Sequence, residues 1–326
     1  MILSYFFRLL CLALASFFLA HLVAGLAISL GTNAAVRIAH RMRPYLAARF
    51  LLGLRLLPVG FAFLVVAGLC VPSYLRLEPE AATEHVGLGF LAVALLSLAI
   101  WGSSIMRGLR AGARSRAYIR ECQGVGREVH VAGECSPIWV IEGACPLVAL
   151  AGVICPRLVI SRKVVDTLSP DQLAAALRHE NAHRVTRDNL KRLSLLLAPG
   201  ILPLVGGYAA LERGWAKFAE WAADDRAVSG DVHRSLSLAA ALVRVSRLSA
   251  AAGQAPLMTS LLGDGRDLTE RVDRLLSEAL PCEQRGHRIS LLVVSATFTL
   301  AAASVAVMLQ PATLYSVHRF LELLIR

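Results

Sequence analysis

The chain has 326 residues, enough for one or two domains, but 56% of them are hydrophobic and only 17% are charged. This balance excludes an ordinary water-soluble globule and indicates a membrane protein. The formal net charge of +11 would suit a nucleic-acid-binding protein, but in a membrane protein an excess of arginine usually marks cytoplasmic loops.

Four uncharged runs are each long enough to cross a bilayer as a helix, which takes about 20 apolar residues. They are residues 9–32, 56–75, 86–106 and 289–310. The first run exceeds the roughly 7–15 apolar residues of a signal-peptide core, and no clear A-x-A cleavage site ends it. We therefore expect a retained transmembrane helix there, and four transmembrane helices in all.

The placement of arginine predicts how these helices are oriented, because cationic loops resist translocation. The loop after the first run and the segment after the third run are rich in arginine, whereas the loop after the second run is acidic. The N-terminus is then outside, residues 107–288 lie in the cytoplasm, and the tail at 311–326 is outside. The arginines concerned are Arg37, Arg41, Arg43, Arg49, Arg107, Arg110, Arg114, Arg116 and Arg120.

Residues 127–161 combine short β-branched runs with Gly and Pro, which predicts a small lobe of three or four strands. The stretch D-T-L-S-P-D-Q-L that follows predicts the start of a helix. Ser169 is a candidate N-cap, Pro170 takes the first helical position, and Gln172 can complete a capping box. We expect this helix to run from residue 170 to about residue 193.

The predicted helix carries H-E-N-A-H. His179 and His183 lie one turn apart on the same face, so both can bind one metal ion. Glu180 is turned about 100° away but stays close enough to hold a water on that ion. It is the candidate general base, taking a proton from the water and passing it to the leaving amine. The motif alone arises by accident in roughly one chain in a hundred of this length, and a solvated face of mixed charge is the alternative.

A catalytic zinc needs a third protein ligand, with its fourth position open for water. The metzincin pattern would need a histidine where this chain has Asn189, so it is excluded. A later helix, expected over residues 215–229, places Glu220 and Asp224 on one face. Glu220 is the candidate ligand and Asp224 a candidate acceptor for a ligand histidine, although an exposed acidic face would also explain the pair. His233 is a further candidate, as third ligand or transition-state stabiliser, against the alternative of a surface histidine.

Four ordered segments between residues 145 and 276 resemble the integral-membrane zinc peptidases of the bacterial β-lactam sensor-transducer (BlaR/MecR-like) family. They are C-P-L-V-A-L-A-G-V-I-C-P-R-L-V-I-S, H-E-N-A-H-R-V-T-R-D-N-L, E-W-A-A-D-D-R-A-V-S-G-D and L-T-E-R-V-D-R-L-L. The resemblance implies one zinc ion at His179, His183 and Glu220, with Glu180 as base and Asp224 in support. It also implies a multi-pass protein of the bacterial inner membrane that is mainly α. A cytoplasmic α+β gluzincin-type peptidase domain would lie between spans three and four and would make a regulatory cut in a cytosolic repressor.

One departure from that family is large. The antibiotic sensors carry an extracellular penicillin-binding domain after the last span, where this chain has about fifteen residues without S-x-x-K or K-T-G. The resemblance therefore does not imply direct β-lactam sensing. The quality-control (HtpX/Ste24-like) membrane zinc peptidases share H-E-x-x-H and the later E-x-x-x-D, and cleavage of membrane proteins is the alternative role. A non-catalytic membrane signalling scaffold is a third interpretation, but a scaffold needs no general base.

Residues 193–211 carry no charge and are long enough for a further span, yet one crossing would separate Glu220 from His179 and His183. Prolines and glycines interrupt the middle of the segment, so we expect a bent hairpin that enters the membrane or packs on the spans. A buried hairpin without lipid contact is the alternative. The expected partners are protein or peptide substrates and the lipid bilayer, with a homodimer left open. Direct nucleic-acid binding is not expected, because the arginines cluster beside the spans.

Overall fold

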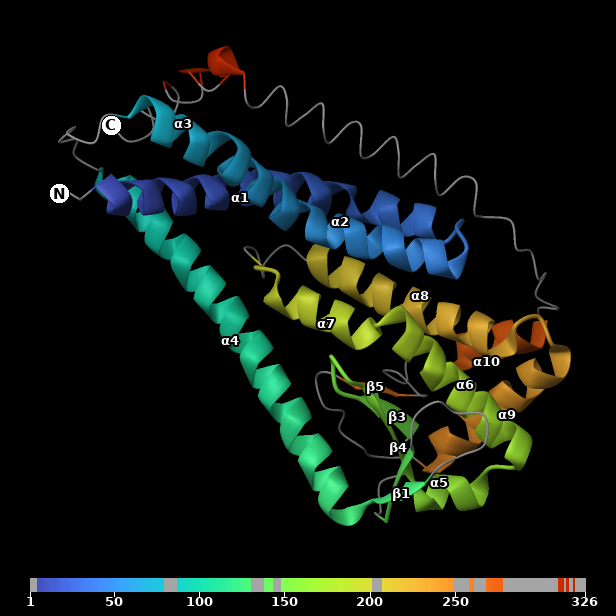
Figure 1. The fold of residues 1–326 in the computed structure, drawn as a ribbon. Coiled ribbons are helices and arrows are strands. Elements are labelled where there is room, and N and C mark those ends of the chain that lie inside the picture. The colour runs from blue at the N-terminus through green and yellow to red at the C-terminus, as the bar shows by residue number, and fades with distance from the viewer. Residues whose placement is uncertain are drawn as a thin grey trace.

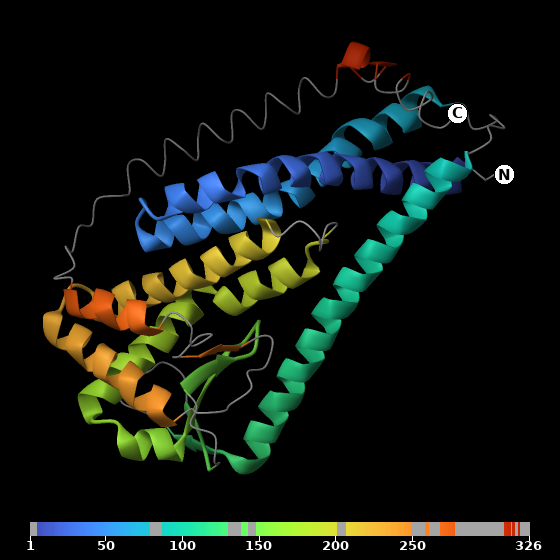
Figure 2. The same ribbon diagram turned by 180° about the vertical axis from the view of Figure 1, so that it is seen from behind.

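The computed structural model describes residues 5–78, 87–129, 138–142, 148–200, 207–248, 258–260, 268–277, 310–313, 315–316 and 319 (Figure 1). Within these residues the chain is mainly helical and contains one five-stranded sheet. The helices of residues 5–125 frame the structure. The sheet and the later helices fill the space between the helix at residues 88–125 and the pair at residues 5–39 and 44–65 (Figures 1 and 2).

Three helical stretches are long and apolar enough to cross a membrane, and each contains most of one of the first three predicted spans. The fourth predicted span, residues 289–310, lies outside the described residues apart from Gln310. The three stretches are α1 (Tyr5–Ala39), the continuous run of α2 (Pro44–Val65), a π-helical turn (Val66–Cys70) and α3 (Val71–Leu77), and α4 (Leu88–Val125).

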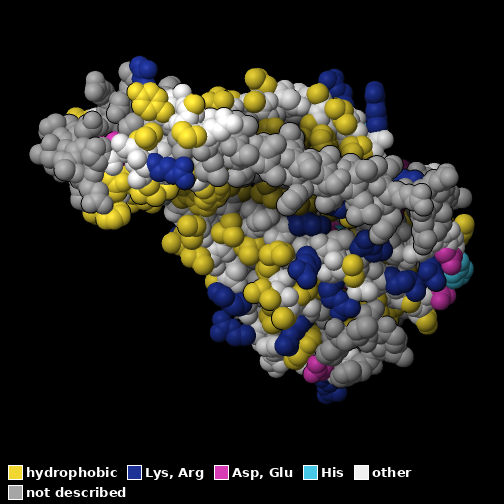
Figure 3. Space-filling model, turned by 45° about the horizontal axis from the view of Figure 1, so that its top comes forward, with side chains coloured by type: hydrophobic (Ala, Val, Ile, Leu, Met, Phe, Trp, Pro, Cys, Tyr) yellow, Lys and Arg dark blue, Asp and Glu magenta, His cyan; other side chains and the backbone are white. Residues whose placement is uncertain are grey.

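The apolar surfaces of these helices are mostly uncovered by protein. Between 17% and 39% of their most apolar windows is buried, so the larger part faces outward. Figure 3 shows hydrophobic side chains over the upper part of the molecule and most visible lysines and arginines over the lower part. An exposed apolar surface of this extent marks a membrane or protein contact, which accords with spans that face lipid.

Helix α4 continues far beyond the third predicted span, which was expected to end at residue 106. Its buried positions recur every three or four residues through Ser104, Gly108, Ala111 and Ser115, so one face packs inward along the whole length. The arginines of this segment lie on exposed positions of the same helix instead of in a separate lobe. The chain therefore leaves the apolar region as a continuous helix that reaches the sheet.

The sheet has the order β1-β2-β4-β3-β5, with β2 and β4 parallel and the other pairs antiparallel. Four strands come from residues 127–161, as predicted, and the fifth is added from a segment after the helices. The strands are β1 (Arg127–Val129), β2 (Ile138–Ile141), β3 (Val148–Ala151), β4 (Arg157–Ser161) and β5 (Met258–Ser260).

Six helices accompany the sheet, and apolar residues of β2 to β4, α5, α6, α8, α9 and α10 form its main core. The prediction of one helix from residue 170 to about 193 is wrong. The helix ends at Thr186, because Arg187 takes a left-handed conformation with φ of 54° and turns the chain. The helices are α5 (Arg162–Thr167), α6 (Pro170–Thr186), α7 (Asp188–Leu197), α8 (Gly207–Val228), α9 (Val232–Leu248) and α10 (Leu268–Ser277).

The uncharged segment 193–211 is not one helix. It ends α7, turns after Leu197, and begins α8 at Gly207, eight residues before the predicted start at 215. Helices α7 and α8 run in opposite directions side by side (Figures 1 and 2). The chain thus goes out along α7 and returns along α8, which brings Glu220 back to the histidines of α6.

Candidate metal centre

Helix α6 presents the H-E-N-A-H residues from a well-defined start. The Ser169 side chain accepts a hydrogen bond from the backbone N–H of Gln172, and the Gln172 side chain accepts one from the backbone N–H of Ser169. This capping box fixes the first turn of the helix. The helix then packs against α8, α9 and β3, so that His179, Glu180 and His183 are all buried.

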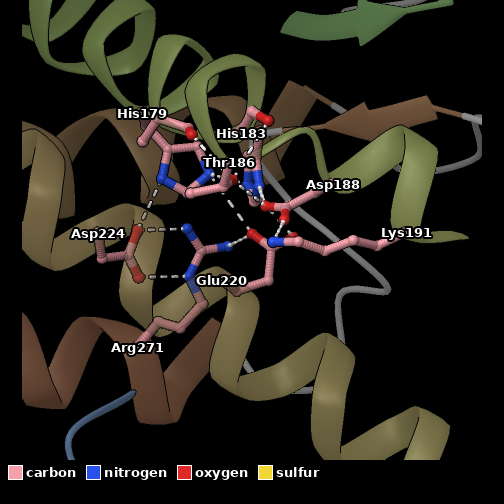
Figure 4. A network of polar contacts seen from close by, with 9 residues as sticks. His179, His183, Thr186, Asp188, Lys191, Glu220, Asp224 and Arg271 are labelled. Atoms are coloured by element: carbon pink, nitrogen blue, oxygen red, sulfur yellow. Dashed lines mark hydrogen bonds and ion pairs between the residues drawn. The ribbon is translucent and has the colours of Figure 1, made fainter. Parts of the chain in front are cut away.

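Three side chains converge with the separations that a tetrahedral zinc site requires. The Nε2 atoms of His179 and His183 are 3.2 Å apart. Oxygens of Glu220 lie 3.4 Å from Nε2 of His179 and 3.7 Å from Nε2 of His183 (Figure 4). Ligands at about 2.0–2.1 Å from a tetrahedral zinc stand about 3.3 Å from one another. The residues present therefore fit one zinc ion, and they form a buried set of potential ligands.

A carboxylate orients each histidine. Oδ1 of Asp224, one turn after Glu220 on α8, lies 2.9 Å from Nδ1 of His179. Oδ2 of Asp188, the first residue of α7, lies 2.7 Å from Nδ1 of His183. A carboxylate at Nδ1 holds the proton there and leaves Nε2 free to bind a metal. The break at Arg187 is what lets Asp188 face back toward α6.

Arg271 of α10 joins the two acidic residues of α8. Its Nε and Nη2 donate to the two oxygens of Asp224 at 2.8 and 2.7 Å, and its Nη1 lies 3.2 Å from Oε2 of Glu220. The guanidinium is 2% exposed, so these are buried charge contacts. Arg271 thus compensates the charge of both carboxylates and fixes the orientation of their side chains.

The electrostatics of the cluster favour a cation at its centre. Burial acts to lower the pKa of His183, but the carboxylates of Glu220 and Asp188 outweigh it and raise the pKa to about 10. The pKa of Glu220 lies well below its usual range because His183 and Arg271 outweigh the opposing effect of burial. A protonated imidazole thus supplies the positive charge that a metal ion would supply.

Glu180 lies beside this cluster with its carboxylate available. The residue is fully buried, and neither carboxylate oxygen has a hydrogen-bond partner among the residues that the structure describes. Burial raises its pKa to about 7, opposed by the nearby imidazoles of His179 and His183. A carboxyl group with a pKa near 7 can both accept and return a proton at physiological pH.

The predicted site residues differ in where the structure places them. His179, His183 and Glu220 meet as the ligand set. Asp224 contacts His179, and the charge of Glu180 interacts with all three ligands. His233 lies on the exposed first turn of α9, outside the cluster. Sequence reasoning gave no role to Asp188 and Arg271. Asp188 belongs to the segment R-D-N-L and Arg271 to the segment E-R-V-D-R-L-L. The resemblance of these two segments to the sensor-transducer peptidases was the signal that could have pointed to both residues.

Comparison with known proteins agrees with this geometry. Residues 137–255 match peptidase family M48, a range that contains α6 and α8 and thus all three ligands. The match does not extend to the BlaR/MecR-like group, and a search of curated proteins gives no match. The matched region is similar to the peptidases of family M48, and its buried His-His-Glu set for one zinc ion is that of a zinc metallopeptidase.

Proposed function

We propose that the chain is a zinc endopeptidase embedded in the bacterial inner membrane, which cuts protein substrates at the cytoplasmic face. The observation that carries this proposal is the buried ligand set beside Glu180, whose carboxylate has no hydrogen-bond partner among the described residues. The same chain holds three helices that are long and apolar enough to cross a membrane. A water-activating site and a membrane anchor thus occur in one polypeptide.

Each residue around the site has a distinct role in the proposed reaction. Zinc held by His179, His183 and Glu220 would supply a Lewis acid that acidifies a water and polarises the scissile carbonyl. Glu180 accepts the proton of the attacking water and donates it to the departing amine. Asp188 and Asp224 keep the imidazoles in the orientation that presents Nε2. Arg271 keeps Glu220 and Asp224 in place through each turnover.

The arginine pattern supports a site near the cytoplasmic surface. The arginine pattern assigns the turn after α1 and residues 107–288 to the cytoplasm, with a fourth span at 289–310. His40 of that turn stacks edge-on against Phe218 with ring centroids 5.1 Å apart. Phe218 precedes the ligand Glu220 by two residues. The proposed zinc therefore lies near the C-terminal end of α1, which the arginine pattern assigns to the cytoplasmic side.

The substrate is proposed to be a protein whose cleavage conveys a signal, such as a cytosolic repressor. This part rests on the resemblance of four segments to the sensor-transducer peptidases. Cleavage of membrane proteins in quality control is the competing role, because that group shares the H-E-x-x-H and E-x-x-x-D residues. The two roles are distinguished by the proteins that accumulate uncut in a Glu180→Gln strain. One regulatory target supports the signalling role, and many damaged membrane proteins support quality control.

The mechanism is tested with Glu180→Gln in the full-length chain. This variant is expected to keep near-stoichiometric zinc but to lose cleavage of a general protein substrate and of itself. Asp171→Asn, an exposed carboxylate-to-amide change on the same helix, is the matched control and should retain full activity. Unchanged proteolysis in Glu180→Gln would refute the mechanism. Zinc that persists after His179→Ala would refute the ligand assignment.

A further inference from the structure

Helix α8 packs against two different parts of the molecule. Its first half packs against α1 and α2, where Leu211 and Trp215 share a buried cluster with Leu51. Its second half carries Glu220 into the metal centre. The helix is continuous from Gly207 to Val228. Whatever fixes its first half along α1 and α2 therefore also sets where Glu220 stands.

The approach of α8 to α1 is unusually close. A Cβ on Gly207 would stand 3.0 Å from the backbone Cα of Ser29, and a Cβ on Gly25 would stand 2.5 Å from the hydroxyl of Tyr208. Small residues at such contacts let helix backbones approach closely, as they do between helices in membranes. The first half of α8 thus has little freedom to move sideways from α1.

Arg55 of α2 fixes α8 along its axis. Its Nε donates to Oε1 of Glu212 at 2.7 Å, and its guanidinium lies over the ring of Tyr208 with 4.3 Å to the centroid. Tyr208 and Glu212 are one turn apart on α8, so a single arginine contacts two successive turns. Arg55 is 4% exposed, and a planar guanidinium in an ion pair and a ring contact permits little sliding or rotation.

The position of Arg55 within α2 makes this contact costly to maintain. It stands directly before the second predicted span, residues 56–75, in a helical stretch that is long and apolar enough to cross a membrane. The ring nitrogens of His21, Nη1 of Arg55 and the hydroxyl of Tyr208 are buried without a hydrogen-bond partner in the described part of the chain. Buried polar atoms without partners are costly to fold, so their presence beside Arg55 calls for a functional explanation.

We propose that Arg55 is a positioning residue for the zinc site, acting through Glu212 and the rigid body of α8. Glu212 and Glu220 are eight residues apart, about 12 Å along the helix. A metal site tolerates ligand distances within about 0.2 Å, so a small axial shift of α8 at Arg55 displaces the Glu220 carboxylate beyond that tolerance. The Arg55–Glu212 ion pair thereby couples the position of α2 to the position of the third ligand, Glu220. This inference rests on the proposed membrane peptidase, but its test does not require proteolysis.

The test measures the rate of zinc loss to a chelator from the full-length chain in lipid nanodiscs. Arg55→Ala is expected to lose zinc about tenfold faster than the unchanged chain, the lower end of the effect seen for residues that orient metal ligands. The control is Arg49→Ala, on the same helix. Arg49 bonds and stacks with Tyr45 of α2 itself, so its removal should leave the rate unchanged.

Two further variants separate positioning from simple destabilisation. The exchanged pair Arg55→Glu with Glu212→Arg should return the rate to within about twofold of the unchanged chain. Glu212→Gln, at a partly exposed position, should give an intermediate rate and serves if Arg55→Ala does not fold. Equal rates of zinc loss in Glu212→Gln, Arg55→Ala and Arg49→Ala would overturn the proposal. Failure of the Glu180→Gln test would instead overturn the proposed peptidase and leave these rates untouched.

Discussion

The Nδ1 atom of His183 lies 2.7 Å from Oδ2 of Asp188, a contact that crosses the break between α6 and α7. Asp188 also accepts hydrogen bonds from the hydroxyl of Thr186 and from Lys191. It is therefore held in place on both sides of the turn. The carboxylate is 5% exposed, so water cannot readily replace it as the partner of His183.

Replacement of Asp188 is expected to weaken zinc binding. In Asp188→Ala the His183 ring loses the acceptor that sets its tautomer and orientation, and zinc affinity should fall by about 10- to 100-fold. Competition with a chromogenic chelator measures the change. Asp166→Ala, an exposed carboxylate on α5, should have no effect. Equal affinities in the two variants would show that Asp188 does not orient the ligand.

Arg271 is expected to matter for stability as well as for the metal. Arg271→Met leaves the Asp224 and Glu220 carboxylates buried without their cation, which costs about 3–5 kcal/mol when one partner of a buried pair is removed. The denaturant midpoint of the chelator-treated chain should fall accordingly. Arg271→Lys should rescue little, because an ammonium cannot reproduce the two parallel bonds to Asp224.

The control for this prediction lies on α9. Arg234 pairs with Asp231, and their side chains are 43% and 45% exposed. Removal of such an exposed pair changes stability little. If Arg234→Ala lowered the midpoint as much as Arg271→Met, the role assigned to the buried contacts of Arg271 would be wrong.

Local signals allowed the metal ligands to be predicted from the sequence. H-E-N-A-H needs only the pitch of a helix to bring His179 and His183 together, and Ser169, Pro170 and Gln172 mark where that helix begins. Glu220 could be predicted because a charged pair four residues apart stands on one helical face. The structure places all three ligands together, in an arrangement that fits one zinc ion.

Nonlocal contacts account for what the sequence did not reveal. Arg271 meets Asp224 across 47 residues, and Arg55 meets Glu212 across 157, and no spacing rule predicts such pairs. The helix break at Arg187 was missed because a left-handed arginine has no distinctive sequence signal of the kind that glycine gives. The continuation of α4 beyond residue 106 was missed because its inward face carries small residues, Gly108 and Ala111, instead of a conspicuous apolar stripe.

Zinc affinity is expected to rise with pH. The pKa of His183 is raised to about 10 in the metal-free fold because Glu220 and Asp188 outweigh the effect of burial. Below that pH a proton occupies the imidazole, and zinc must displace it. Affinity should increase about tenfold per pH unit between pH 7 and 9 for the one proton released.

Calorimetric titrations of zinc in two buffers with different ionisation enthalpies measure the protons released. At least one proton per zinc is expected near pH 7.5. His233→Ala, which changes an exposed histidine outside the cluster, should release the same number. The same raised pKa gives the metal-free fold a stabilising contribution that is complete below pH 6.5 and is lost as pH rises through about 10. An affinity that does not change from pH 7 to 9 would contradict the assigned protonation.

The turn between α7 and α8 is expected to lie within the lipid. Gly207 packs on Ser29 of α1, which lies within the first predicted span, residues 9–32. A dye attached through Gly200→Cys, in a chain whose other cysteines are replaced, should be quenched by lipids that carry a spin label on the acyl chain. Both Gly200 and Gly124 have open space where a Cβ would stand, and Gly124, near the far end of α4, provides the control at which quenching should be absent. Equal quenching at the two positions would mean that the hairpin packs on the spans without entering the bilayer.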